Sequence, residues 1–117
     1  MDQKTEAEII ARIVNGDREA FALLVEEYKT RVYNLAFRMT GNQEDARDLA
    51  QDAFVTSFRQ LARYDLSRSF FTWLYTITLN IIRNHLKKTD RRRRDFIAQG
   101  LLTDAAFFKH GKTVGIG

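Results

Sequence analysis

The stretch that decides the fold is residues 61–74, which read LARYDLSRSFFTWL. It lies within a run from Asn42 to Gln99 that contains neither Gly nor Pro. One unbroken helix of that length would span about 80 Å, which is too long for so small a domain. Residues 65–69, DLSRS, offer Asp and Ser as helix N-caps and are the only good place for a break. We therefore expect one helix to end near Tyr64 and another to begin near Phe70.

Apolar residues recur at gaps of three and four before this break, which indicates helices with one buried face. Residues 5–8, TEAE, have the pattern of a capping box with Thr5 as the N-cap, and Gly16 is expected to end this first helix. Asp17 is expected to cap a second helix. Residues 41–42, GN, then end the second helix and cap the third.

The fourth helix is expected to run from about Phe70 to about Arg92. Its spacing predicts that the buried side chains are Phe70, Leu74, Ile77, Ile81 and, near its end, Leu86. No segment alternates polar and apolar residues for long enough to indicate a strand. We therefore predict an all-α fold, a compact bundle of about four helices over residues 1–94, with residues 95–117 forming a short, poorly defined tail or the start of an interdomain linker.

The composition excludes several classes of protein. The chain has no Cys, which removes disulfides and thiolate metal ligands. It has no run of about 18 apolar residues, and its first residues, MDQKTE, are too polar and acidic for a secretory signal. We therefore expect a cytoplasmic protein that does not bind a membrane.

The charge of the chain is unevenly distributed. Residues 1–65 carry 9 Lys or Arg and 12 Asp or Glu, whereas residues 66–94 carry 8 Lys or Arg and one acidic residue, Asp90. Such an asymmetry favours a polyanionic partner at one face. The basic part begins with residues 67–74, SRSFFTWL, whose aromatic side chains could stack on unpaired bases while cations hold the phosphates. This combination is typical of a protein that binds single-stranded nucleic acid.

An acidic face is expected on the third helix, where Glu44, Asp45, Asp48 and Asp52 follow one another at gaps of one, three and four. Three interpretations stay open at this point: a solvated helix face, a docking surface for a basic partner helix, and a Mg²⁺ site of an all-α nucleotide pyrophosphatase. The metal site would need a second acidic pair, which the sequence does not offer clearly.

The two histidines, His85 and His110, have no partner spacing that indicates catalysis. We predict no catalytic residue, no metal and no cofactor.

Three blocks of sequence together resemble region 2 of bacterial sigma factors, most closely the compact extracytoplasmic-function group. The blocks are residues 45–54, DARDLAQDAF, then residues 70–74, FFTWL, with Ile77 and Asn80, and an earlier set of Asp17, Ala20, Phe21, Leu24 and Tyr28. The resemblance covers about residues 5–94, in the order and spacing of the family. It implies a promoter-recognition protein that binds RNA polymerase and is not itself an enzyme.

The resemblance also implies roles for particular residues. The third helix would bind the clamp helices of the largest polymerase subunit through Asp45, Arg47, Asp48, Gln51, Asp52 and Val55. The loop at about residues 65–71 and the following helix would bind the separated non-template strand of the minus-ten promoter element, with one base flipped into a pocket. The residues implied to contact DNA are Ser67, Arg68, Ser69, Phe71, Trp73, Thr76, Ile77, Asn80, Arg83, Asn84, Lys87 and Lys88. An anti-sigma protein is implied as a further partner.

Two points qualify this assignment. Helical spacing places Phe70 in the core and points Phe71 away from the core. It does not decide whether Trp73 lies in the core or on the surface. Members of the family carry a second, helix-turn-helix domain, but only 23 residues follow Arg94. We therefore expect this domain alone to bind promoter DNA weakly. The alternative function is a general helical nucleic-acid-binding module that leaves the acidic face unused.

Overall fold

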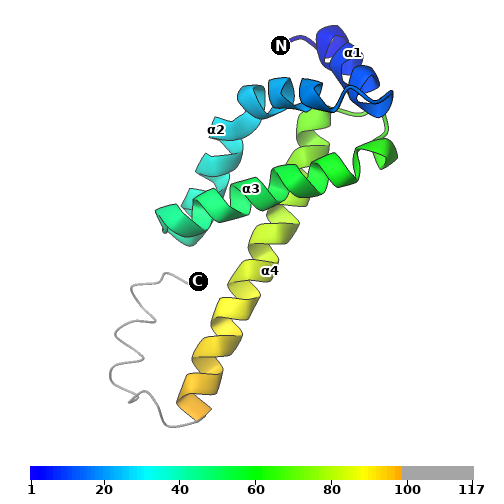
Figure 1. The fold of residues 1–117 in the computed structure, drawn as a ribbon. Coiled ribbons are helices and arrows are strands. Elements are labelled where there is room, and N and C mark those ends of the chain that lie inside the picture. Colours follow the sequence, from blue (N-terminus) through cyan, green and yellow to red (C-terminus); the bar gives the residue numbers. More distant parts are fainter. Residues whose placement is uncertain (99–117) are drawn as a thin grey trace. The chain divides into compact units, whose positions relative to one another are not determined.

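The computed structural model describes residues 1–98 of the 117-residue chain, and Figure 1 shows that this part is helical. Its elements are α1 (Gln3–Val14), η1 (Arg18–Ala20), α2 (Phe21–Thr40), α3 (Gln43–Arg59), η2 (Leu61–Arg63) and α4 (Phe70–Ala98), where η marks a single 3-10 turn. Over residues 1–98 there is no strand, which confirms the all-α prediction. No helix in that range is long and apolar enough to cross a membrane.

The chain divides into two units, Met1–Ile82 and Arg83–Gly117, and α4 contributes to both. The first unit contains α1, α2, α3 and the beginning of α4. The second unit is described as far as Ala98. Most of the tail predicted at residues 95–117 therefore lies outside the described residues, and the predicted domain boundary after Arg94 stays a prediction.

The N-terminal caps differ from those predicted. Helix α1 begins at Gln3, because Asp2 is its N-cap and accepts a 2.7 Å hydrogen bond from the backbone N–H of Thr5 at its Oδ1. This bond lowers the pKa of the Asp2 carboxyl. The prediction of Thr5 as the cap was wrong. Asp17 stands at the start of η1 but makes no capping bond, since its carboxylate accepts a 2.8 Å bond from Nη2 of Arg12.

The connection between α2 and α3 is the one predicted. Gly41 has φ +67°, in the left-handed region that only glycine enters without strain, and its N–H donates to the carbonyl of Phe37 at 2.8 Å. Asn42 is the N-cap of α3, and its Oδ1 accepts from the backbone N–H of Asp45 at 2.9 Å. Each of the two helix ends therefore has a capping hydrogen bond within a two-residue turn.

The core lies inside the unit Met1–Ile82. It contains fully buried side chains from three helices, among them Leu24 of α2, Ala53 of α3, and Phe70 and Leu74 of α4. The predicted core position of Phe70 is confirmed. The break at residues 65–69 and the start of α4 at Phe70 are also confirmed.

The buried stripe of α4 differs from the prediction beyond Leu74. Thr78 and Ile82 are fully buried, whereas the predicted Ile77 and Ile81 are only half-buried. The stripe advances by four residues at each step from Phe70 to Ile82, so the one predicted step of three, from Leu74 to Ile77, was wrong. A buried threonine is accommodated because its hydroxyl donates to the carbonyl of Leu74 at 2.8 Å, so no polar atom is left without a partner.

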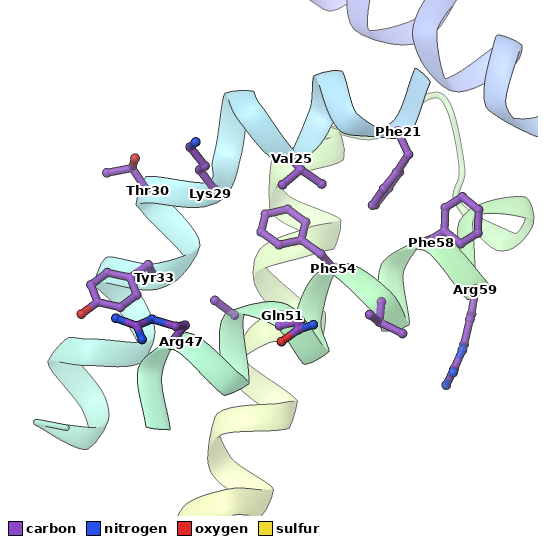
Figure 2. A pocket seen from close by; sticks show the side chains of 12 residues that line it. Phe21, Val25, Lys29, Thr30, Tyr33, Arg47, Gln51, Phe54, Phe58 and Arg59 are labelled. Carbon is purple, nitrogen blue, oxygen red and sulfur yellow. The ribbon is translucent and has the colours of Figure 1, made fainter. Parts of the chain in front are cut away.

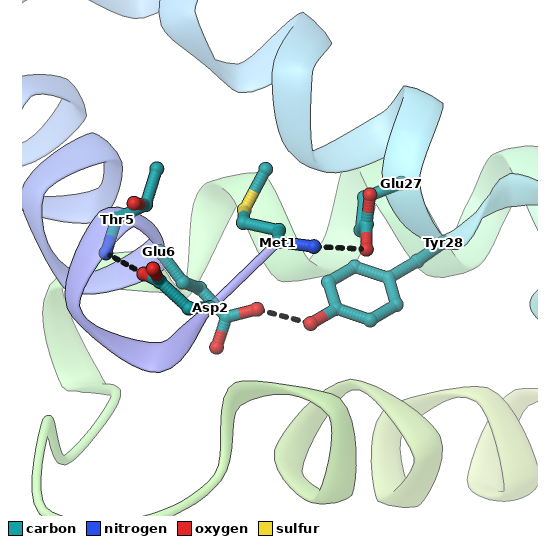
Figure 3. Close-up of polar contacts among 6 residues, drawn as sticks. All are labelled: Met1, Asp2, Thr5, Glu6, Glu27 and Tyr28. Carbon is teal, nitrogen blue, oxygen red and sulfur yellow. Dashed lines mark hydrogen bonds and ion pairs between the residues drawn. The ribbon is translucent and has the colours of Figure 1, made fainter.

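A buried polar contact connects α1 to α2 (Figure 3). The hydroxyl of Tyr28 donates to Oε2 of Glu6, and both residues are buried. Burial raises the pKa of the Tyr28 hydroxyl, and the hydrogen bond to Glu6 raises it further. The other side of the Tyr28 ring reaches α4, where it lies 5.7 Å from the ring of Phe70 and 5.4 Å from that of Phe71. Tyr28 therefore holds α1, α2 and α4 together.

Replacing Tyr28 with phenylalanine should lower the free energy of unfolding by about 1–3 kcal/mol, because the buried carboxyl of Glu6 loses its donor. Urea denaturation followed by circular dichroism measures this. Tyr75→Phe is the matched control, because it removes the hydroxyl of a tyrosine that is 38% exposed. Equal losses from the two changes would show that the contact with Glu6 contributes nothing.

The raised pKa of Tyr28 also predicts a loss of stability at alkaline pH. The unfolded chain releases the tyrosine proton near pH 10.0, while the folded chain retains it to higher pH. The contribution is therefore complete below pH 10.0 and declines as the pH rises further. Unfolding measured between about pH 9 and 11 should show a steeper decline for the unmodified chain than for Tyr28→Phe.

Candidate functional site

The loop between η2 and α4 is held by its own hydrogen bonds. Oδ1 of Asp65 accepts from the backbone N–H of Ser67 at 2.9 Å and from its hydroxyl at 2.8 Å. These two bonds lower the pKa of the Asp65 carboxyl, the backbone bond having the larger effect. The backbone N–H of Arg68 donates to the carbonyl of Asp65 at 3.0 Å, and the Tyr64 hydroxyl donates to the carbonyl of Arg68. The loop therefore has a defined shape although residues 65–69 are all exposed.

A hollow of about 390 Å³ lies beside this loop. It is lined by Arg68, Ser69, Thr72, Trp73 and Thr76. The ring of Trp73, the only tryptophan in the chain, is half-buried and lies 5.2 Å from that of Tyr64. The volume of the hollow falls within the range of small-ligand sites, about 300–1,000 Å³. The walls offer one aromatic ring, three hydroxyls and one guanidinium.

The structure brings most of the predicted loop and α4 residues of the first unit to the surface. Ser67, Arg68, Ser69, Thr76 and Asn80 are exposed, and Trp73 and Ile77 are half-buried. Four of the predicted residues line the hollow, and so does Thr72, which was not among them. The signal for Thr72 is its position four residues before Thr76 on the same helix face.

Phe71 is an exception, because helical spacing points it away from the core, whereas the structure packs it against α2. Its ring is half-buried and stacks on Tyr28 with an angle of 22° between the planes. The guanidinium carbon of Arg31 lies 5.2 Å from the centre of the Phe71 ring, which is a cation–π contact. Phe71 therefore does not line the hollow. Its partners come from α2, and nothing in the local sequence around Phe71 indicates them.

The unit that begins at Arg83 carries the predicted basic residues. Arg83, Asn84, Lys87 and Lys88 are exposed, and their gaps of one and three put them on one side of the helix. Further along the same helix, Nη2 of Arg94 pairs with Oδ2 of Asp90 at 2.5 Å. This segment offers cations to a polyanion.

The acidic face of α3 is open to solvent. Asp48 and Asp52 are exposed, and their gap of four places them on the same side of the helix. Asp45 is half-buried at the first turn of α3, where its backbone N–H is bonded to Asn42. An acidic first turn stabilises the helix through its dipole, so Asp45 has a structural use besides any role in binding.

The remaining predicted α3 residues line an apolar groove of about 660 Å³ between α2 and α3 (Figure 2). Its floor includes Phe21 and Val25 of α2 and Phe54 and Phe58 of α3, and the Phe21 ring lies 5.1 Å from that of Phe58. The predicted residues in its lining are Arg47, Gln51 and Val55, and Val55 is 40% exposed. The side chains of Lys29 and Arg59 add two further cations.

The structure therefore divides the six predicted docking residues into two groups. Arg47, Gln51 and Val55 line the groove, while the carboxylates of Asp45, Asp48 and Asp52 lie outside its lining. Sequence reasoning missed the groove, because the spacing of apolar residues assigns each of them to the buried face of a helix and does not show where two helices leave a gap. The available signal was the exposed Val55, an apolar residue next to the polar face of α3.

Among residues 1–98, no group of three or more His, Asp or Glu side chains is arranged so that it could hold a metal ion. The carboxylates of α3 have no second acidic pair facing them in that part of the chain. The described residues thus give the pyrophosphatase alternative no metal centre.

The hollow and the groove belong to different elements of one helical unit, so the fold defines a module with two separate candidate sites. Residues 24–92 match the model of the family described as Sigma-70 region 2. The chain belongs to this family, whose members are factors of transcription initiation, as the resemblance of the sequence predicted.

The most similar relatives include several sigma factors. The chain is 34% identical over 109 residues to the RNA polymerase sigma-H factor of Pseudomonas aeruginosa, covering 93% of this chain and 55% of the relative. It is 39% identical over 79 residues to the ECF RNA polymerase sigma factor SigW of Bacillus subtilis, covering 68% of this chain and 42% of the relative. These relatives confirm the extracytoplasmic-function group. The chain spans about half of the length of the curated relatives it matches.

Two solved structures have the same fold. One is the NMR structure of an engineered region 2 of sigmaE in complex with GTAAAA, with a TM-score of 0.70 and 36% identity, which covers 79% of this chain and 97% of that one. The other is CnrH in complex with the cytosolic domain of CnrY, with a TM-score of 0.63 and 26% identity, covering 86% of this chain and 68% of that one.

Proposed function

We propose that this chain is the promoter-recognition domain of an alternative sigma factor, which binds RNA polymerase and opens the minus-ten promoter element. The observation that carries the proposal is the hollow beside the loop at residues 65–69, lined by Trp73 and hydroxyl groups. The sigmaE region 2 that shares this fold was solved in complex with GTAAAA, which supports a nucleic-acid strand as the ligand.

The hollow suits one unpaired base. Removing a base from the stack costs a few kcal/mol, which the protein must offset. Stacking on an aromatic ring supplies about 1–3 kcal/mol, and Trp73 offers such a ring at the hollow. The hydroxyls of Ser69 and Thr72 can donate and accept hydrogen bonds at the edge of the base, while that of Thr76, which donates to the carbonyl of Thr72 at 3.0 Å, can accept one. Arg68 can hold a neighbouring phosphate.

The exposed face of α4 is proposed to bind the rest of the strand. Asn80 is exposed, and its amide can both donate to and accept from a base edge, so it can contribute selectivity. Arg83, Lys87 and Lys88, with Asn84, would contact the phosphates. Phosphate contacts add affinity for every sequence alike and weaken as salt rises.

The outer side of α3 and the adjoining groove are proposed to bind the clamp helices of the polymerase. Asp48 and Asp52 can accept bidentate hydrogen bonds from arginines of the partner. The groove would take apolar side chains from the same partner, and Gln51 in its lining can bond to polar groups at the edge of the contact. Electrostatic matching of this kind fixes the orientation of a complex.

A regulatory partner of the anti-sigma kind is proposed as well. The related CnrH was solved in complex with the cytosolic domain of CnrY, so a member of this fold does bind a second protein. A partner that covers the groove or the hollow would prevent binding of polymerase or DNA, respectively. We propose that these contacts take place in the cytoplasm, where bacterial polymerase works.

Reversing one charge on α3 should weaken polymerase binding. Asp48→Arg is expected to raise the Kd for core polymerase about tenfold or more, because a like charge opposes the basic partner. Gln51→Ala should have a smaller effect in the same direction. Fluorescence anisotropy of the labelled chain with core polymerase measures both.

Glu8→Arg is the matched control, because it makes the same charge change at an exposed position of α1. Unchanged binding of Asp48→Arg and Gln51→Ala would refute the docking surface. It would favour the general nucleic-acid-binding module instead.

Two substitutions on α4 should separate base reading from phosphate binding. Asn80→Ala should reduce the preference for a minus-ten strand over a scrambled one. Lys87→Ala should weaken both strands alike and reduce the slope of log K against log salt by about 0.7, the value for one phosphate of a single strand. Binding titrations with both strands at several salt concentrations measure this. Equal effects of the two substitutions on both strands would remove Asn80 from base recognition.

A further inference from the structure

We propose that Asp65 is a positioning residue, whose carboxylate shapes the loop at residues 65–69 so that the hollow is ready to receive a base. The proposal rests on the proposed function of the hollow and adds a residue that does not itself line it. It concerns selectivity for the captured base and not the contact with the polymerase.

The carboxylate of Asp65 organises the first half of the loop. Its Oδ1 accepts both the backbone N–H and the hydroxyl of Ser67, at 2.9 and 2.8 Å. Its Oδ2 lies 3.9 Å from Nε of Arg68, and its carbonyl accepts from the N–H of Arg68 at 3.0 Å. Asp65 thus holds Ser67 and Arg68, the two residues after the exposed Leu66. Arg68 is the first of the residues that line the hollow.

Tyr64 holds the second half of the loop. Its hydroxyl donates to the carbonyl of Arg68, so Arg68 is bonded through its N–H to Asp65 and through its carbonyl to Tyr64. The ring of Tyr64 packs edge-on against buried Phe70 at 5.5 Å and lies 5.2 Å from the ring of Trp73. The loop side and the aromatic side of the hollow are therefore connected through a single tyrosine.

These hydrogen bonds matter because the first half of the loop, Asp65 to Ser67, is supported by the bonds of Asp65, whereas Ser69 is held by α4, through the backbone N–H of Trp73 at 3.2 Å. All five residues 65–69 are exposed, and Leu66 is 58% exposed, so no side chain of the loop is anchored in the core. Without the bonds of Asp65 the loop would sample many conformations, and a binding base would have to order it at a cost in affinity. Asp side chains that accept from the backbone two residues ahead form a turn of this kind.

The charge of Asp65 makes the proposal easy to distinguish from an electrostatic effect. A carboxylate beside a nucleic acid repels phosphates, so its removal alone should strengthen binding. A positioning role predicts the opposite result. Asn at this position has no charge either, but its Oδ1 can accept the same two bonds from Ser67.

The experiment compares strands with and without the captured base. A pool of single strands with six randomised positions is bound to the full chain, and the strand retained most strongly is resynthesised with one abasic nucleotide at each position in turn. The unmodified chain should lose most affinity at one position. Quenching of Trp73 fluorescence, the only tryptophan signal, reports base stacking there.

Asp65→Ala should weaken binding of the intact strand about tenfold and leave binding of that abasic strand nearly unchanged. Asp65→Asn should bind both strands at least as tightly as the unmodified chain, because it keeps the bonds to Ser67 and loses only the negative charge. Tyr64→Phe keeps the ring, loses the bond to Arg68, and should show the pattern of Asp65→Ala in weaker form. Thermal unfolding of each variant checks that the helices remain intact.

The outcomes distinguish the inference from the proposed function. If the unmodified chain retains no strand by sequence, or has no position where the base matters, the proposed function fails. If the unmodified chain has such a position and Asp65→Ala distinguishes the intact strand from the abasic strand equally well, only the positioning role fails. The positioning role would also be overturned if Asp65→Ala weakened binding of the intact and the abasic strand equally. The same holds if Asp65→Ala and Asp65→Asn bound the intact strand with equal affinity.

Discussion

The burial of Phe70 is the contact on which the rest of the arrangement depends. Phe70 is the first residue of α4 and is fully buried, with its ring 5.7 Å from Tyr28, 5.5 Å from Tyr64 and 5.7 Å from Trp73. Because a large apolar side chain is withdrawn from water at this point, the chain after the loop must start its helix against α2. The hollow exists because Trp73 and the loop are both held against this same ring cluster.

Two surfaces of different chemistry result from one small core. The side of α3 combines exposed carboxylates with an apolar groove, while the loop and α4 combine an aromatic ring, hydroxyls and cations. The carboxylates of α3 repel phosphates, whereas the cations of the loop and α4 attract them. Since the two surfaces use different residues, a protein partner and a DNA strand need not compete for the same side chains.

The sequence predicted what depends on local chemistry and missed what depends on distant neighbours. The break at residues 65–69, the Gly41 turn and the buried Phe70 followed from caps, glycine and helical spacing, and all three are confirmed. Phe71 was misplaced because its partners lie on α2. The burial of Thr78 was missed because helical spacing counts only apolar residues as buried. Its hydroxyl can be buried because it donates to the carbonyl of Leu74. The exposed site residues are visible in the sequence, but the groove between two helices is not.

The face of α4 that carries Thr72, Thr76 and Asn80 has a consequence for how such a domain changes over evolution. These residues follow one another at gaps of four on a helix without glycine or proline, so their spacing is set by the helix itself, about 1.5 Å per residue. One inserted residue would rotate everything beyond it by about 100° and separate the amide from the hydroxyls. Side chains along this face can therefore be exchanged without moving their neighbours, whereas an inserted residue is accommodated with less disturbance in the exposed loop around Leu66.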